Sequence, residues 1–310
     1  MNSQESSVDQ RIRLASFAWL SKQTKVHGDV LQRQLLTQGF EFEGKRVPLV
    51  GPQGIFKPQA LSKIPLSITT TSDGPYDDSF DHNGLLMYRY RGTDPNHKDN
   101  EGLRTAMKEQ IPLIYFHGIV PGKYYVIFPV FIVGDIPHKL TFKVAADDPV
   151  YFKTFLGSSK TTLVADSNDE ARRAYLTATI KQRLHQRGFR EKVLLAYRQQ
   201  CSFCRLRHPE LLDAAHIIPD SEPEGIPTVQ NGIALCKLHH AAFDSYLLGL
   251  RPDYIIEVRK DVLDEEDGPM LLHGLKNLSE KRILLPSPPE LSPSKILLEK
   301  RYAEFKIASQ

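Results

Sequence analysis

Four side chains that can bind a metal ion occur in two pairs with the same spacing. Cys201 and Cys204 form the first pair, and Cys236 and His239 form the second, with two residues between the members of each pair. Two turns that each offer two ligands suit a tetrahedral zinc ion, and all three cysteines of the chain fall in this pattern. The spacing therefore predicts a structural zinc that stabilises a loop-rich unit. The alternative is a set of free core thiols with His239 packed beside them.

Between and just after these pairs lie residues that could hydrolyse a phosphodiester. That reaction needs a base for water and positive charge near the scissile phosphate. His216 ends an apolar, strand-like run, where a neutral imidazole could take the proton of a water molecule; it could also be an ordinary structural histidine. His240 and Asp244 are four residues apart on a predicted helix, so they share one face. Together they could bind Mg²⁺ or Mn²⁺, or simply make a polar contact with each other.

Asn231 and Asp213 are further candidates in the same region. Asn231 precedes Gly232, and an Asn-Gly pair is a strong signal for a hairpin turn that requires no chemistry. Asp213 lies two residues before Ala215, so on a strand both side chains would point the same way.

Residues 201 to 250 resemble the HNH nuclease family. The resemblance rests on His216, Asn231, His240 and the surrounding Cys and His pairs, and the run from Arg187 to Tyr197 looks like the lead-in of predicted restriction endonucleases that carry this domain. It implies a ββα-metal fold, a hairpin followed by a helix around one divalent ion. It also implies that His216 is the general base, that Asn231 orients it, and that His240 binds the ion.

The sequence departs from this family at Ala215. Many HNH enzymes have an acidic residue or a histidine there as a further metal ligand. We expect Asp213 to substitute through its longer reach, or water to fill the position.

A second resemblance lies nearer the N-terminus and covers about residues 45–145. Tyr76-Asp77-Asp78 precedes the run from Tyr88 to Gly92, and strand-like runs follow as far as Val133. This order resembles the SRA (SET- and RING-associated) domain, a PUA-like β barrel that reads modified cytosine by flipping it out of the duplex.

The SRA resemblance implies a pocket for an extruded base. Tyr76 and Tyr90 would stack on the two faces of the base, and Asp77 or Asp78 would accept its amino hydrogens. Arg91 stands where eukaryotic members have a small hydroxyl residue, so it belongs with the pocket. The alternative is structural: tyrosines of alternating runs pack in a barrel wall, and Tyr-Asp-Asp makes a turn.

Basic residues mark a surface for a polyanion. The segment 171–208 contains ten Lys or Arg residues and one acid, Glu191. Within it we expect Arg187 and Arg190 to contact the DNA backbone, together with Arg89 on a strand of the SRA-like domain; a solvated basic surface is the alternative.

These sites require an α+β chain of four parts. The sequence predicts a helical extension over residues 1–40, with two short helices that could form a helix-turn-helix-like unit. It predicts the SRA-like barrel over residues 41–156, with strands near residues 66–71, 85–90, 113–116, 124–133 and 140–144. Residues 157–200 predict a linker followed by two basic helices, and residues 201–310 the zinc-stabilised HNH domain.

Composition excludes several protein classes. The 310 residues are 41% apolar and 25% charged, with three cysteines and a net charge of +3, which excludes a disordered tail, a collagen-like chain and a disulfide-rich miniprotein. No apolar run is long enough for a bilayer, and the start carries no secretory signal, so we expect a cytoplasmic, prokaryotic-type protein without a membrane partner.

The leading hypothesis is a modification-dependent restriction endonuclease that acts on double-stranded DNA, reading 5-methyl- or 5-hydroxymethylcytosine. One HNH site cuts one strand, so a double-strand break predicts a homodimer. The alternatives are an HNH nickase or endonuclease whose N-terminal domain reads plain sequence or a partner, and a DNA reader whose zinc domain does not cleave.

Overall fold

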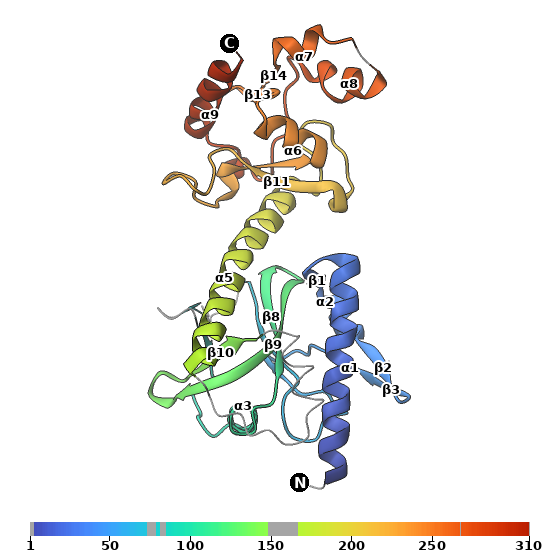
Figure 1. Cartoon of the computed structure of the whole chain (residues 1–310), viewed down its shortest axis with the longest axis vertical. Helices are drawn as coiled ribbons and strands as arrows, with labels where there is room; N and C mark the ends of the chain where they lie inside the picture. Colours follow the sequence, from blue (N-terminus) through green and yellow to red (C-terminus); the bar gives the residue numbers. More distant parts are fainter. Residues whose placement is uncertain (1–2, 73–78, 81–84, 148–166, 267, 310) are drawn as a thin grey trace. The chain divides into compact units, whose positions relative to one another are not determined.

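The chain forms two compact units in the computed structural model, Met1–Leu184 and His185–Gln310, and we describe each by itself. The structure describes residues 3–72, 79–80, 85–147, 167–266 and 268–309 (Figure 1). Both units mix helices with strands, as the predicted α+β class requires.

The helices and strands have the following bounds. The helices are α1 (Ser3–His27), α2 (Arg33–Gln38), α3 (Lys98–Lys108), α5 (Ser167–Ala196), α6 (Lys237–Asp244), α7 (Lys260–Asp264), α8 (Pro269–Gly274) and α9 (Lys295–Ala308). The strands of the first unit are β1 (Val30–Gln32), β2 (Phe40–Phe42), β3 (Lys45–Val47), β4 (Ile55–Phe56), β5 (Ser67–Thr70), β6 (Ser79–Phe80), β7 (Leu86–Arg89), β8 (Leu113–Val120), β9 (Lys123–Ile136) and β10 (Thr141–Ala146). Those of the second unit are β11 (Leu212–His216), β12 (Gly232–Cys236), β13 (Leu248–Leu250) and β14 (Ile256–Val258).

A curled sheet forms the centre of the first unit. Its strand order is β4-β5-β8-β9-β10-β7-β6, with β1 also paired to β9, and β5 runs parallel to β8. Both faces are buried, because alternate residues of β8 enter different cores: Leu113 and Tyr115 lie in one, Ile114 and Phe116 in the other. Within the described residues β4 and β6 are not paired with each other, so a closed SRA-like barrel stays a prediction.

The N-terminal segment differs from the predicted pair of short helices. One helix, α1, continues to His27 and ends at Gly28, whose φ of +79° suits glycine. Strand β1 follows, and the second predicted helix forms after it as the short helix α2. The two predicted helices are therefore present, but α1 is long and a strand rather than a simple turn separates it from α2. The apolar residues Phe17 and Leu20 of α1 pack against one face of the sheet, in the same core as Ile114 and Phe116.

The five strands predicted between residues 66 and 144 are confirmed. They correspond to β5, β7, β8, β9 and β10. The remaining strands of this unit are too short to show a periodic pattern, and helix α3 was not predicted.

The second unit is built around the hairpin of β11 and β12 and the helix α6 that follows it. The strands pair antiparallel from Leu212↔Cys236 to His216↔Gly232, which confirms the predicted hairpin-then-helix order. Helix α9 supports the end of α6: Arg301 is 7% exposed, donates to the carbonyl of Phe243 at 3.0 Å, and lies over the Tyr246 ring.

Helix α5 contains the boundary between the units. The sequence predicts two helices separated near Gly188, but α5 is continuous through this glycine. A single glycine costs only about 1 kcal/mol relative to alanine, which a long helix tolerates. Residues 157–166 of the predicted linker lie outside the described residues. None of the described helices is long and apolar enough to cross a membrane.

Candidate functional site

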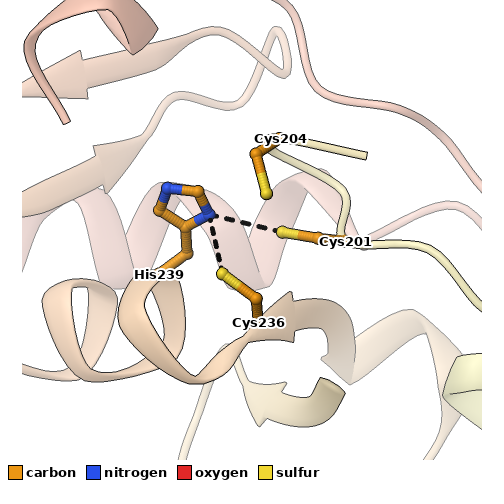
Figure 2. Close-up of side chains that lie close together, drawn as sticks. All are labelled: Cys201, Cys204, Cys236 and His239. Atoms are coloured by element: carbon orange, nitrogen blue, oxygen red, sulfur yellow. Dashed lines mark hydrogen bonds between the residues drawn. The ribbon is translucent and has the colours of Figure 1, made fainter. Parts of the chain in front are cut away.

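The two Cys/His pairs come together as predicted. Cys201 and Cys204 project from the turn after α5, Cys236 ends β12, and His239 lies in the first turn of α6 (Figure 2). Their ligand atoms all lie within 4.8 Å of one another. Around a tetrahedral zinc with the usual Zn–S and Zn–N lengths, ligand atoms lie about 3.6 Å apart, so the cluster fits such an ion.

The imidazole of His239 has the orientation of a metal ligand. Its Nδ1 faces the Cys236 and Cys201 sulfurs at 3.2 and 3.4 Å, and its Nε2 lies 2.7 Å from the carbonyl oxygen of Gly274. A ligating histidine commonly donates its second N–H to such an oxygen, which fixes its tautomer. Among the described residues this is the one cluster of three or more Cys, His or acidic side chains with metal-binding geometry.

His216 is half-buried at the end of β11. Its ring stacks on Phe189 of α5, with 4.0 Å between centroids and 15° between planes, and its buried Nε2 has no hydrogen-bond partner among the described residues. Burial lowers the pKa of His216, while the negative charges of Asp220 and Asp244 oppose the shift. The imidazole is therefore predominantly neutral at pH 7, the form that a general base requires.

His240 lies between two carboxylates on opposite edges of its ring. Its Nε2 is 3.2 Å from Asp244 Oδ2, and its Nδ1 is 3.9 Å from Asp213 Oδ2. The hydrogen bond to Asp244 raises the pKa of His240. His240 and Asp244 thus offer one nitrogen and one oxygen to a common point, as Mg²⁺ or Mn²⁺ would need.

Asp213 is engaged by basic side chains. Its carboxylate accepts from Lys237 Nζ at 2.7 Å and lies 3.5 Å from Arg190 Nε. Although burial opposes it, the hydrogen bond from Lys237 holds the pKa of Asp213 below its ordinary value. Asp213 faces Nδ1 of His240 whereas Asp244 faces Nε2, so the two carboxylates do not converge on one nitrogen.

Asn231 fixes the chain that follows His216. Its side chain is 1% exposed, accepts from Ile218 N at 2.9 Å, and donates to the carbonyls of Ile218 at 2.9 Å and Ile226 at 3.2 Å. Its own carbonyl accepts from Ile217 N at 2.9 Å. Both the oxygen and the nitrogen of the Asn231 side-chain amide therefore bind the backbone that follows His216.

The predicted hairpin turn at Asn231-Gly232 is wrong. Residues 217–231 connect the two strands, and Gly232 is the first residue of β12. Gly232 has a different reason to lack a side chain: a Cβ there would lie 2.5 Å from Val193 Cγ2 and 2.9 Å from Phe189 Cζ. It is needed because α5 packs close to the hairpin at this point.

Most of the predicted base pocket cannot be placed. Tyr76, Asp77 and Asp78 lie outside the described residues. Tyr90 is 2% exposed, its ring centroid lies 4.5 Å from that of Phe142, and its hydroxyl bonds to Asp135. Tyr90 thus sits in the sheet core, the structural alternative that the sequence left open.

The arginines predicted to contact DNA differ in their exposure and in the contacts that they make. Arg91, predicted for the base pocket, contacts Gln53 and Asp99. Arg190, predicted for the DNA backbone, donates to Glu191 at 2.6 Å as well as to two backbone carbonyls. Arg89 and Arg187 are exposed. The contacts of Arg190 therefore stabilise the second unit, and Arg190 would have to break some of them to bind phosphate.

Three residues that contribute to the site, Phe189, Lys237 and Asp220, have no signal in the sequence that predicts their role. Phe189 lies in the quoted lead-in run, but no spacing rule relates it to His216, 27 positions later. Lys237 follows Cys236 directly, yet its bond to Asp213 depends on the strand register. Asp220 approaches His216 through the loop after β11.

Comparison with known proteins supports the nuclease assignment. Residues 201–251 match the HNH_2 family model, described as HNH endonuclease. The match covers the four candidate zinc ligands Cys201, Cys204, Cys236 and His239, called the Cys3His cluster below for its three cysteines and one histidine. It also covers His216, Asn231, His240 and Asp244. The prediction of a DNA-cleaving hydrolase is thereby confirmed.

Two solved structures show distant similarity to the chain. The "Modification dependent TagI restriction endonuclease" is 14% identical, with 78% of this chain and 82% of that chain covered and a TM-score of 0.27. The "Type IV phosphorothioation-dependent restriction endonuclease ScoMcrA" is 17% identical, with 58% and 46% covered and a TM-score of 0.21. A search of curated proteins gave no match.

Proposed function

We propose that this chain is a modification-dependent restriction endonuclease that reads modified cytosine in double-stranded DNA and hydrolyses the DNA backbone with its HNH unit. One observation supports the proposed nuclease activity most strongly. A single hairpin and the helix after it bring His216, His240 and Asp244 within electrostatic range of one another. All three lie inside the segment that matches the HNH endonuclease family.

His216 acts as the general base. Its neutral imidazole accepts the proton of the attacking water, and Asn231 fixes the backbone that carries it. The negative charges of Asp220 and Asp244 stabilise the imidazolium once the proton has been transferred.

His240 and Asp244 hold the catalytic divalent ion. When bound, Mg²⁺ or Mn²⁺ supplies positive charge at the scissile phosphate and the leaving oxygen. Asp213, anchored by Lys237, lies 3.9 Å from Nδ1 of His240 and its negative charge favours a proton on that nitrogen. Nε2 would then be left for the ion, so Asp213 has a positioning role in place of direct ligation.

Zinc in the Cys3His cluster is structural. All four protein ligands are supplied by Cys201, Cys204, Cys236 and His239, which leaves no open position for a substrate. The ion ties the turn after α5 to the start of α6, the helix that carries His240 and Asp244.

The N-terminal unit supplies recognition by base flipping. The support is the SRA-like order of motifs, with Tyr76, Asp77, Asp78, Tyr90 and Arg91 as pocket residues. To stack on a base, Tyr90 would have to leave its bonds with Asp135 and Arg104. A homodimer would cut both strands, and the cytoplasm is the expected compartment.

Phosphate contacts are best supported for exposed basic side chains of the second unit. Arg187 is exposed on α5. Arg205 and Arg207, in the turn that follows Cys204, are exposed and make no side-chain hydrogen bond or ion pair within the described part of the chain. Arg205 and Arg207 can therefore bind phosphate without first breaking a contact.

Plasmid cleavage tests the proposal. The full chain is incubated with Mg²⁺ or Mn²⁺ and with methylated, hydroxymethylated or unmodified plasmid. We expect cleavage of modified DNA only, and its loss in His216→Ala with zinc content and DNA binding retained. Equal cleavage of all three plasmids would support the HNH enzyme with a different recognition domain. Binding without cleavage would support the non-cleaving reader.

A further inference from the structure

Phe189 covers one face of the His216 ring. The two centroids are 4.0 Å apart, the planes differ by 15°, and Phe189 is 4% exposed. Phe189 belongs to α5, outside the segment 201–251 that matches the HNH family. The ring that contacts the imidazole most closely therefore comes from an element that precedes the nuclease hairpin.

The contact depends on a close fit between α5 and the hairpin. Gly232 pairs with His216 across the two strands. A Cβ at residue 232 would lie within 3 Å of both Val193 and Phe189, so the ring of Phe189 reaches His216 only because glycine occupies this position.

Hydrogen bonds do not fix the buried edge of the imidazole. Its Nε2 has no partner among the described residues, and the Asn231 side chain bonds to backbone groups of Ile218 and Ile226 rather than to the ring. A histidine usually takes its orientation from the group bound to its second nitrogen. For His216, the stacking contact is the feature that sets the plane of the ring.

We propose that Phe189 is a positioning residue for the general base: its ring holds the plane of the His216 imidazole so that the solvent-facing edge meets the attacking water. The inference rests on the proposed function, since it concerns how that base is aimed. Positioning has a large effect on rate, because a displacement of about 1 Å can cost roughly 100-fold.

The competing explanation is that Phe189 only fills the core. Phe189→Leu separates the two roles, because leucine restores apolar volume but has no flat face. Tyrosine is unsuitable, since its hydroxyl would extend from Cζ toward Gly232. Leu194→Ala is the matched control: Leu194 is fully buried on the same helix, in the same core, without a ring contact to His216.

The experiment compares these variants in the full chain under saturating divalent ion. Proton NMR gives a second readout, because the Phe189 ring current shifts the His216 ring protons upfield; their signals are assigned by their absence in His216→Ala. For Phe189→Leu we expect kcat to fall about 10- to 100-fold at nearly constant KM, with zinc content kept and the upfield shift lost. Leu194→Ala should lose melting temperature with kcat nearly unchanged.

Three results would overturn the inference. Phe189→Leu could keep wild-type kcat, it could lose kcat only as much as Leu194→Ala, or the wild-type His216 protons could lack the upfield shift. Failure of the proposed function looks different: His216→Ala would then cleave DNA like the wild type, or the wild type would cleave none.

Discussion

At the scale of single residues, His216 and His240 have opposite electrostatic environments. Burial lowers the pKa of His216, whereas the hydrogen bond to Asp244 raises the pKa of His240. A neutral base and a histidine that attracts positive charge can therefore coexist at one pH, which is the division of roles that base and metal ligand require.

The pH dependence of cleavage follows from the direction of the His216 shift. Because the base must be neutral, activity should be complete at pH 7 and fall as pH decreases through the lowered pKa. We expect the acid limb of kcat to have its midpoint below about 6.5. Measurement at saturating Mn²⁺ removes the competition between the ion and a proton on His240. A midpoint above 6.5 under these conditions would refute the assignment of His216.

The side-chain hydrogen bonds of Asn231 are expected to stabilise the second unit against unfolding. Asn231→Ala leaves the N–H and C=O of Ile218 and the carbonyl of Ile226 without their side-chain partner. The free energy of unfolding, measured with urea, should fall by about 3 kcal/mol. Asn277→Ala, at an exposed position of the same unit, should change it by less than about 0.5 kcal/mol. Equal effects of the two substitutions would show that the bonds of Asn231 do not stabilise the loop.

Sequence patterns could predict residues whose spacing alone defines a site. Cys201, Cys204, Cys236 and His239 form such a set, and so do His240 and Asp244 one helical turn apart. The Phe189–His216 stack could not be predicted, because it depends on how α5 packs on the hairpin. For the same reason the Asn231-Gly232 pair predicts a turn, whereas in the structure Gly232 allows α5 to pack closely on the hairpin.

At the scale of elements, two short strands and one helix carry the candidate nuclease site. The β11–β12 hairpin is too small to bury an extensive core alone. The Cys3His cluster holds the start of α6, and Arg301 of α9 binds the carbonyl of Phe243 near its end. Both ends of the helix that carries His240 and Asp244 are therefore fixed.

Removal of zinc should destabilise this arrangement. Metal analysis is expected to give one zinc per chain, and a strong chelator should lower the melting temperature and abolish cleavage. In Cys236→Ser, which lacks one ligand, the chelator should add little further loss. Purified protein without zinc that melts at the wild-type temperature would disprove the structural role.

Element boundaries were predicted well where a pattern is long. The five central strands follow from alternating apolar spacing. The break predicted at Gly188 was wrong because propensity at one residue is outweighed by the helix on either side. Strand β1 has only three residues, too few for a recognisable sequence pattern, and it forms because it pairs with β9.

At the scale of the whole molecule, the two compact units correspond to the proposed division between recognition and cleavage. The second unit contains the candidate zinc cluster, the candidate catalytic residues and the exposed Arg205 and Arg207 near Cys204. We therefore expect its basic surface to supply affinity for any DNA, and the first unit to supply discrimination.

Salt dependence tests the basic surface. The double variant Arg205→Gln/Arg207→Gln removes two phosphate contacts. The negative slope of the logarithm of the DNA-binding constant against the logarithm of the salt concentration should therefore become less steep by about 2. Binding is measured with the divalent ion removed. The matched control is Lys260→Gln with Lys281→Gln, two exposed lysines without a side-chain partner in the described residues. The same slope in both double variants would exclude Arg205 and Arg207 as phosphate contacts.

The most direct measurement is the cleavage rate of modified plasmid by the wild-type chain and by His216→Ala, with zinc content and DNA affinity determined on the same preparations. We predict cleavage by the wild type, at least a 100-fold slower rate for His216→Ala, and equal zinc and affinity in both. Wild-type cleavage by His216→Ala would contradict this account.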